Sequence, residues 1–247
     1  MEHTIYAASP HRPSPALDHD DQLFGFRDRA SGARMGFYRP CDRYDLWQQY
    51  VVGATRTYRR FGAENALTLP TTTPESITPI FAVAHDNNDD VVAGWYANGP
   101  LDAVYEAHAP SEFQADPLAA TLVAEWISQA LPDGAIELKA GWVGHHAHNK
   151  GALADLVARS FVHALRFLRV RYAFGTVAQH AGPRWCGAGA RPVDGIPATP
   201  YPDERYLTSF YQWDLHTAHA RSAPEQQQLF LSDIEMGSPT MTSGVRQ

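Results

Sequence analysis

Residues 137–156 read ELKAGWVGHHAHNKGALADL and contain the transition that decides the fold. The apolar residues 135–143 have the composition of a β-strand. From residue 151 onward, apolar side chains recur at spacings of three and four, which predicts an amphipathic helix. Those apolar positions are Leu153, Leu156, Val157, Phe161, Ala164, Leu165 and Leu168. The chain therefore passes from strand to helix through a short polar loop.

This loop holds three histidines, His145, His146 and His148, followed by Lys150 and Gly151. Unpaired backbone N–H groups and the dipole at a helix N-terminus attract anions, so the loop can hold a phosphate, or it can be an ordinary polar turn. Three histidines within four residues rarely all reach one ion, and neither a cysteine nor a carboxylate accompanies them at ligand spacing. We therefore predict no metal site.

Composition limits the class of protein. The chain has 247 residues, a net charge of −7 and 44% hydrophobic residues, which suits one domain and argues against a nucleic-acid partner. Two cysteines and the lack of a long apolar run or a signal-peptide pattern indicate a cytoplasmic protein without a membrane span. We expect a flexible N-terminal segment over residues 1–22, a folded domain over 23–219 and a C-terminal tail over 220–247.

The remaining elements alternate between strand and helix. Strands are expected at residues 33–40, 77–85, 91–97, 171–179 and 206–215, and a short turn or helix at 181–193. Helices are expected at 42–62, capped by Asp42, and at 116–134, capped by Asp116. This order predicts a single α/β (α+β) domain with a mixed central sheet.

The hairpin, central strand, polar turn, helix and closing Trp185-x-x-x-Gly189 together resemble the GCN5-related N-acetyltransferase superfamily. The superfamily's turn motif, Arg or Gln, two residues, Gly, one residue and a small residue, matches residues 148–153 with Gly151 kept. The resemblance implies an acetyltransferase-like, mostly antiparallel, splayed sheet flanked by helices. It also implies that the turn holds the pyrophosphate of coenzyme A through His148, Asn149, Lys150, Gly151 and Ala152.

Within the superfamily, the chain is similar to the acyl-homoserine-lactone synthases and the long-chain N-acyl amino acid synthases. Glu137 and Val143 fit their E-x-x-R-x-x-V pattern, in which Ala140 takes the Arg position. This resemblance implies an N-acyltransferase that moves an acyl group from acyl-CoA or an acyl carrier protein to a small amine, including an amino acid. No cofactor would be bound permanently.

Glu137 is then the candidate general base, and the backbone N–H groups near Val143 and Gly144 are candidate oxyanion donors. Glu137 can equally be the structural partner of a Lys or Arg. Exposure of Glu137 to a cleft would favour catalysis, whereas burial in an ion pair would favour a catalytically silent module that binds a pantetheine ligand or a protein partner.

Residues after the helix complete the candidate site. Trp185 takes the place of the tyrosine that often protonates the leaving thiolate, and Gln179 and His180 either touch the pantetheine arm or cap a turn. Cys186 is either an acyl-accepting nucleophile or a packing residue. Five aromatic residues are expected either to line an apolar tunnel or acceptor pocket or to pack in the core: Phe37, Tyr44, Trp47, Trp95 and Tyr96. A zinc hydrolase would need a fourth ligand that the sequence does not offer.

Overall fold

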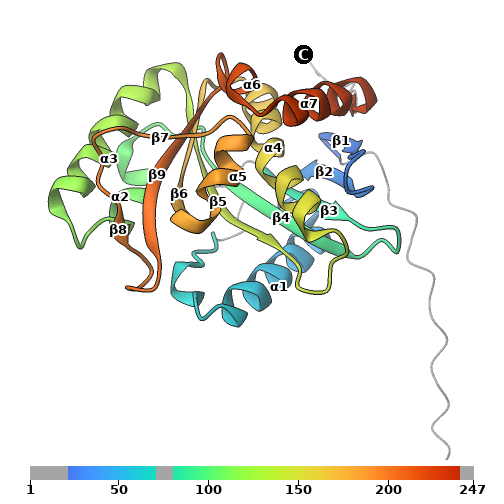
Figure 1. Ribbon diagram of the computed structural model, residues 1–247, viewed down its shortest axis with the longest axis horizontal. Helices are drawn as coiled ribbons and strands as arrows, with labels where there is room; N and C mark the ends of the chain where they lie inside the picture. The colour runs from blue at the N-terminus through green and yellow to red at the C-terminus, as the bar shows by residue number, and fades with distance from the viewer. Residues whose placement is uncertain (1–21, 71–79, 240–247) are drawn as a thin grey trace, which may run out of the picture.

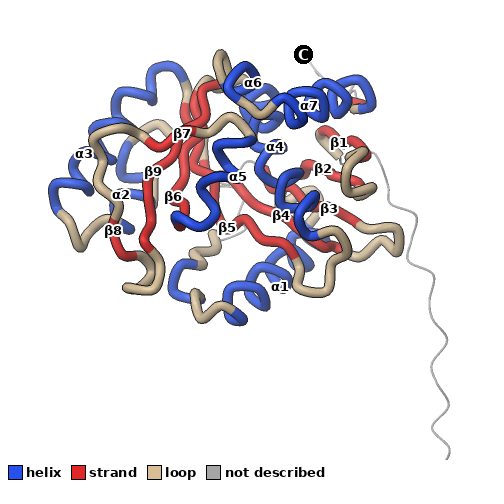
Figure 2. Tube along the Cα trace, viewed as in Figure 1, coloured by secondary structure: helices blue, strands red, loops and turns tan. Residues whose placement is uncertain are grey.

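The computed structural model describes residues 22–70 and 80–239, and these form one sheet with helices on both faces (Figures 1 and 2). The flexible segment expected at residues 1–22 lies outside the described residues except for Gln22, and so do residues 240–247 of the expected tail. No helix in the described ranges has both the length and the apolar character needed to cross a membrane.

The sheet is mixed and mostly antiparallel, as predicted. Its strand order is β10-β1-β2-β3-β4-β5-β6-β9-β7, with β8 paired to β9, and only β5 and β6 run parallel. The strands are β1 (Phe24–Arg27), β2 (Arg34–Tyr38), β3 (Ile80–His85), β4 (Val91–Asn98), β5 (Ala135–Val143), β6 (Tyr172–Ala178), β7 (Arg191–Pro192), β8 (Thr199–Pro200), β9 (Leu207–Asp214) and β10 (Ser238–Pro239).

Helices cover both faces of this sheet. They are α1 (Tyr44–Arg60), α2 (Ala109–Glu112), α3 (Pro117–Ala130), α4 (Lys150–Leu168), α5 (Gly182–Gly187), α6 (Ala218–Arg221) and α7 (Pro224–Met236). Between them, residues 22–70 and 80–239 contain the short 3₁₀ turns η2 (Glu64–Ala66), η3 (Val104–Glu106), η4 (Leu131–Asp133) and η5 (Gln179–Ala181).

Alternation along the strands divides the core between the two faces. In β3, Ala82 packs with the α4 side, whereas Phe81 and Val83 pack with α1. In β4, Trp95 faces α4 and Tyr96 faces α1. A third cluster lies between α3 and the β5, β6 and β9 strands. Because successive side chains point to opposite faces, β3 and β4 each contribute to two cores.

Of the two helix caps expected from the sequence, the structure contains one. Asp116 caps α3 by accepting hydrogen bonds from the amides of Leu118 and Ala119, as predicted. The cap predicted at Asp42 is wrong, because α1 begins at Tyr44 and the preceding residue, Arg43, makes no side-chain cap. Arg43 instead pairs with Asp45 at 2.8 Å.

The C-terminal region differs from the loosely held tail expected from residue 220. Helix α7 packs against β1 and α4, and its Asp233 is fully buried. Arg159 on α4 donates to Asp233 and Asp28, both at 2.7 Å, and to Gln226 at 2.9 Å. A polar network therefore fixes this helix, which hydrophobic periodicity along the sequence does not reveal.

Candidate active site

The sheet splays between its two parallel strands. Strands β5 and β6 pair only where residues 135–137 meet residues 172–174, and they separate beyond that point. A cavity of about 560 Å³ lies there, lined on one side by Tyr58, Lys139 and Trp142 and on the other by Phe161 and Trp185. Because these residues belong to opposite faces of the sheet, the cavity passes between the two strands.

A β-bulge shapes the wall that β5 gives to this cavity. Lys139 pairs with Tyr96 and Trp142 pairs with Gly94, so Ala140 and the residue after it both face one residue of β4. Ala140 has a φ of 48°, in the left-handed region, and its carbonyl accepts a hydrogen bond of 2.9 Å from the Tyr50 hydroxyl. The bulge shifts the alternation by one residue, so that Lys139 and Trp142 both point toward α1.

The backbone amides of Val143 and Gly144, the two expected oxyanion donors, point in different directions. The Gly144 amide donates to the Val92 carbonyl at 2.7 Å, so the prediction that Gly144 supplies a free donor is wrong. Val143 lines the cavity and pairs with Ala93 in the next position of the antiparallel ladder. Since hydrogen-bonded and non-hydrogen-bonded pairs alternate, the Val143 amide points away from β4, toward the splayed side.

A buried charged cluster lies at the α1 side of the cavity. Glu112, at the end of α2, and Lys139, on β5, both line the cavity, and Lys139 Nζ lies 2.5 Å from Glu112 Oε1. His108 Nδ1 lies 2.8 Å from the same oxygen. The other carboxylate oxygen of Glu112 is buried and has no hydrogen-bond partner of ordinary geometry among the described residues. That oxygen is therefore a buried acceptor close to the cavity wall, and Thr176, which also contributes to the pKa of Glu112, is the neighbouring hydroxyl in that wall.

The charges of this cluster stabilise one another. Burial raises the pKa of Glu112, but the Lys139 charge and hydrogen bonds from His108 and Lys139, with a smaller contribution from Thr176, lower it to about 2. Burial lowers the pKa of Lys139, but the carboxylates of Glu137 and Glu112 raise it above its usual value. At neutral pH, Glu112 is thus ionised and Lys139 is charged.

Lowering the pH from 4.5 to about 2 is expected to remove the stabilisation that Glu112 provides. The pKa of Glu112 in the folded protein is about 2, below the value of 4.5 for an unperturbed Glu, so this stabilisation is present above 4.5 and lost as the pH falls through the folded value. Urea denaturation should show the difference in unfolding free energy between the parent protein and Glu112→Gln shrinking over this window. A difference that does not vary with pH would contradict the assignment.

Glu137 does not line the cavity. Its side chain is 1% exposed, and its two oxygens accept hydrogen bonds from the backbone amides of His108 at 2.9 Å and Ala109 at 2.7 Å. Lys139 Nζ lies 3.8 Å away. Burial raises the pKa of Glu137 and the Lys139 charge opposes that shift. The structure therefore favours the structural ion-pair role of Glu137 and does not support direct contact with an acceptor.

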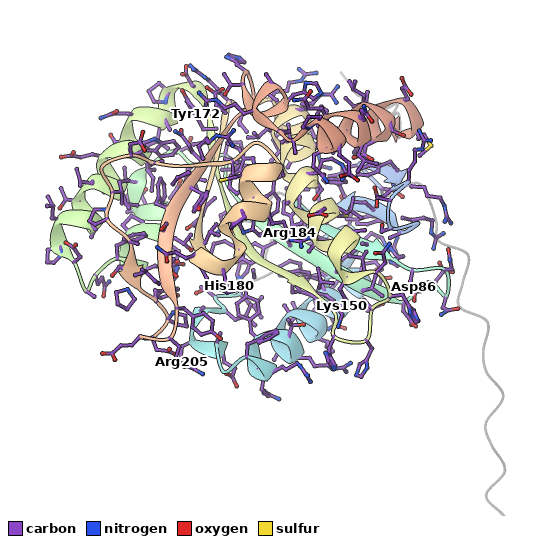
Figure 3. All side chains as sticks on the ribbon, in the orientation of Figure 1. Asp86, Lys150, Tyr172, His180, Arg184 and Arg205 are labelled. Atoms are coloured by element: carbon purple, nitrogen blue, oxygen red, sulfur yellow. The ribbon has the colours of Figure 1, made fainter. Side chains whose placement is uncertain are left out.

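The N-terminus of α4 has the form expected of an anion site. Asn149 precedes the helix with a φ of 54°, and its carbonyl accepts from the Leu153 amide. The amides of Lys150, Gly151 and Ala152 have no acceptor among the described residues. A side chain at Gly151 would meet no atom within 4 Å, so the space in front of this turn is open. Figure 3 shows Lys150 near the beginning of α4.

One arginine and three histidines lie near the same turn. Arg184, on α5, donates to the Gly151 carbonyl at 2.5 Å and pairs with Asp155 at 2.7 Å. His145, His146 and His148 are exposed. The described residues contain no group of three or more His, Cys, Asp or Glu side chains that could hold a metal ion.

Comparison with known proteins shows a family and a fold. No family model matches the chain. The uncharacterized protein Rv1356c of Mycobacterium tuberculosis H37Rv is 35% identical over 211 residues, which cover 82% of this chain and 80% of that protein. The uncharacterized protein Mb1391c of Mycobacterium bovis matches with the same values. The chain belongs to the family of these mycobacterial proteins.

Two solved structures with the same fold are synthases. FeeM, an N-acyl amino acid synthase from uncultured soil microbes, is 9% identical, with a TM-score of 0.54 and coverage of 74% of this chain and 91% of that one. BjaI, a CoA-dependent acyl-homoserine lactone synthase, is 13% identical, with a TM-score of 0.54 and coverage of 87% and 96%. The likeness confirms the fold of the GCN5-related N-acetyltransferase superfamily, near these synthases, for this member of the mycobacterial family.

In this member, the residues after β6 divide between the cavity and the surface. His180 lines the cavity, whereas Gln179 is exposed and does not line it. Trp185 also lines the cavity, where its ring stacks on Phe161 with a centroid distance of 5.0 Å. Cys186 is partly buried against the main core and does not line the cavity, which favours its packing role.

The aromatic tunnel expected from the sequence is wrong, and its alternative, core packing, is correct for four of the five residues. Phe37, Trp47, Trp95 and Tyr96 are buried in the two large core clusters, and Tyr44 is 52% exposed. None of the five lines the cavity. The aromatic walls come instead from Tyr58, Phe61, Trp142, Phe161, Trp185, Tyr201, Tyr206 and Trp213.

Two tyrosines of these walls have hydroxyl groups that are free among the described residues. Tyr58 and Tyr201 donate no side-chain hydrogen bond there, whereas the Tyr206 hydroxyl donates to the Phe61 carbonyl at 2.8 Å. Burial raises the pKa of Tyr58 and of Tyr201 to about 12. Both therefore remain protonated at neutral pH and can donate a proton or a hydrogen bond to a ligand.

Proposed function

We propose that this protein is an N-acyltransferase that moves an acyl group from the thioester of coenzyme A to a primary amine. The observation that carries the proposal is the cavity between β5 and β6, which has the buried Glu112 and Lys139 at its α1 side. The open N-terminus of α4 on the other face supports a seat for the pyrophosphate. BjaI, which has this fold, is by its name CoA-dependent.

The proposed reaction forms one bond and breaks one. The acceptor binds as an ammonium and releases one proton to solvent, which frees the lone pair on nitrogen. The neutral amine then attacks the thioester carbonyl carbon, and the Val143 amide, aimed into the splay, donates to the oxyanion that develops. The intermediate then collapses by breaking the C–S bond, and Tyr201 or Tyr58 protonates the thiolate. The products are an amide and free coenzyme A thiol, and the tyrosine regains its proton from solvent.

Glu112 serves the amine in this proposal. With a pKa of about 2 it is a weak base, but its charge and its free oxygen hold the acceptor nitrogen and stabilise the positive charge that nitrogen carries after attack. His108, whose Nδ1 lies 2.8 Å from Glu112 and whose side chain is 33% exposed, is the group that passes the proton from this cluster to solvent. Lys139 keeps Glu112 ionised and in place.

The direct test uses the full chain and a panel of acyl-CoA thioesters from acetyl to hexadecanoyl, with matching acyl carrier protein thioesters in a second set. Free thiol would be followed with and without pooled primary amines, and the amide product identified by mass spectrometry. We expect thiol release that depends on the amine. Absence of both coenzyme A binding and thiol release would rule out the proposal.

A second candidate function is a catalytically silent module that binds a pantetheine ligand. The position of Trp185 favours it, because an indole cannot protonate a thiolate and this ring is stacked on Phe161. Glu137 favours it as well, since both of its oxygens are already bonded. Binding of coenzyme A without amine-dependent thiol release, across the whole panel, would select this function over the transferase.

Gly151→Val is expected to weaken coenzyme A binding by about tenfold with little change in melting temperature. A Cβ at Gly151 meets no protein atom within 4 Å, so the new side chain would clash with a phosphate and with nothing in the fold. Calorimetric titration with coenzyme A measures the effect. Gly187→Val is the matched control, because this helical glycine also has open space, and its carbonyl accepts from the Ala223 amide before α7 instead of lying in the α4 turn. Equal affinities in the two variants would contradict the seat.

A further inference from the structure

The cavity offers very few charged groups to an acceptor. Among the described residues, the side chains of Asp, Glu, Lys, Arg and His that line it are Glu112, Lys139 and His180, and no arginine is among them. An acceptor with a carboxylate next to its amine would need a positive partner at the same depth as Glu112. The only cation there is Lys139.

Lys139 is not open to a ligand carboxylate. Its side chain is 6% exposed, and its Nζ lies 2.5 Å from Glu112 Oε1 and 3.8 Å from Glu137 Oε1, two buried carboxylate oxygens. A ligand carboxylate that reached this ammonium would lie beside the Glu112 carboxylate and be repelled by it.

The net charge of the cluster also disfavours a carboxylate. Both oxygens of Glu137 accept backbone N–H hydrogen bonds, which is the arrangement of an ionised carboxylate. Two carboxylates thus surround one ammonium, and the free oxygen of Glu112 is an acceptor. This end of the cavity therefore attracts a cation and repels an anion.

His180 does not place a positive group beside Glu112. It follows β6 in the turn η5 (Figure 3) and is exposed. Its ring lies 6.3 Å from that of Tyr206. A carboxylate near it would lie at the mouth of the cavity and not beside Glu112. The other described residues that line the α1 side of the cavity carry no charge. Phe61, Ala63, Ala66 and Tyr201 are apolar or aromatic, and Thr57 and Thr176 add neutral hydroxyl groups.

We propose that the acceptor is a primary amine on an apolar or aromatic body, with no carboxylate on the carbon that carries its nitrogen. This inference rests on the proposed function and narrows it, because it separates decarboxylated amines from the amino acids that correspond to them. Glu112 recognises the ammonium group, and the cavity has no matching group for an α-carboxylate.

Matched acceptors test the inference. Phenethylamine, phenylalaninol and phenylalanine differ only at the carboxylate position, and 3-methylbutylamine, leucinol and leucine form an aliphatic set. With the acyl-CoA that gives the fastest thiol release, we expect kcat/KM for the amine and the amino alcohol to exceed that for the amino acid at least tenfold. The alcohols control for size, since they replace the carboxylate with a neutral group.

The possible failures are distinguishable. A preference for phenylalanine or leucine, or equal rates within a set, would overturn the inference and leave the transferase standing. If no amine raises thiol release from a bound acyl-CoA, the proposed function falls and the inference falls with it.

A variant with an added positive charge in the cavity gives a second test of the inference. Thr57, on α1, lines the cavity, and Thr57→Arg would add the positive group that the wild-type site lacks. We expect this variant to raise the ratio of phenylalanine to phenethylamine turnover about tenfold. Thr55→Arg adds the same charge on the same helix, at a residue that does not line the cavity, and should leave the ratio unchanged. Equal ratios in both variants would count against the inference.

Discussion

Replacing Glu112 with Gln is expected to lower the turnover of acyl transfer by a factor on the order of 10² to 10⁴, the usual contribution of a positioned charged catalytic group. The substitution keeps the side-chain volume and removes the negative charge that holds the acceptor nitrogen. Thioester binding should change little, because Glu112 lies on the α1 side of the cavity and the α4 N-terminus lies on the opposite face. Steady-state rates with the preferred acyl-CoA and amine, normalised to folded protein, measure the effect.

Glu137→Gln is the matched control for this experiment. Both glutamates are buried and both pair with Lys139, but only Glu112 lines the cavity. Each substitution therefore weakens the same cluster, and each should lower the melting temperature. Only Glu112→Gln should also reduce turnover strongly. A comparable loss of turnover in the two variants, or a larger one in Glu137→Gln, would contradict the assignment of the acceptor site to Glu112.

Sequence reasoning chose a strand that lines the cavity, but the carboxylate that lines the cavity is Glu112 and not Glu137. Glu137 belongs to a motif-like run in β5, whereas Glu112 ends a four-residue helix in a stretch without clear periodicity. The two carboxylates are linked through Lys139 on β5 and through His108 at the start of α2. One signal was available, since a lysine inside an apolar strand needs a buried acidic partner.

The fold followed from the sequence where hydrophobic periodicity was strong. The strand expected at residues 135–143 is β5, and the helix expected after Gly151 is α4, which begins at Lys150. The bulge at Ala140 could not be predicted, because an alanine carries no sequence signal for a positive φ. Apart from Trp185, the aromatic walls were not predicted, because periodicity identifies apolar faces but does not distinguish a core from a cavity.

The docking of helix α7 could not be predicted from hydrophobic periodicity. Its sequence, PEQQQLFLSDIEM, is mostly polar and has a weak apolar face, so its docking depends on Asp233. Asp233 meets Arg159, which is 74 residues earlier in the chain. A buried ion pair between two helices leaves no local pattern in either segment, and only tertiary structure reveals it.

Arg159→Met is expected to lower the free energy of unfolding by about 3–5 kcal/mol, the usual cost of breaking a buried ion pair from one side. Arg159 is 2% exposed, and its removal would leave the fully buried Asp28 and Asp233 without their cation. Urea denaturation measures the loss, and faster hydrogen exchange in α7 should accompany it.

Arg166→Met is the control. Arg166 is exposed on the same helix, and its guanidinium lies over the Phe230 ring, so we expect a change of at most about 1 kcal/mol. Adding Asp28→Asn and Asp233→Asn to Arg159→Met should recover part of the stability, because neutral amides cost less to bury unpaired. A small loss in Arg159→Met, or no recovery in the triple variant, would mean that apolar packing and not this network holds α7 to the sheet.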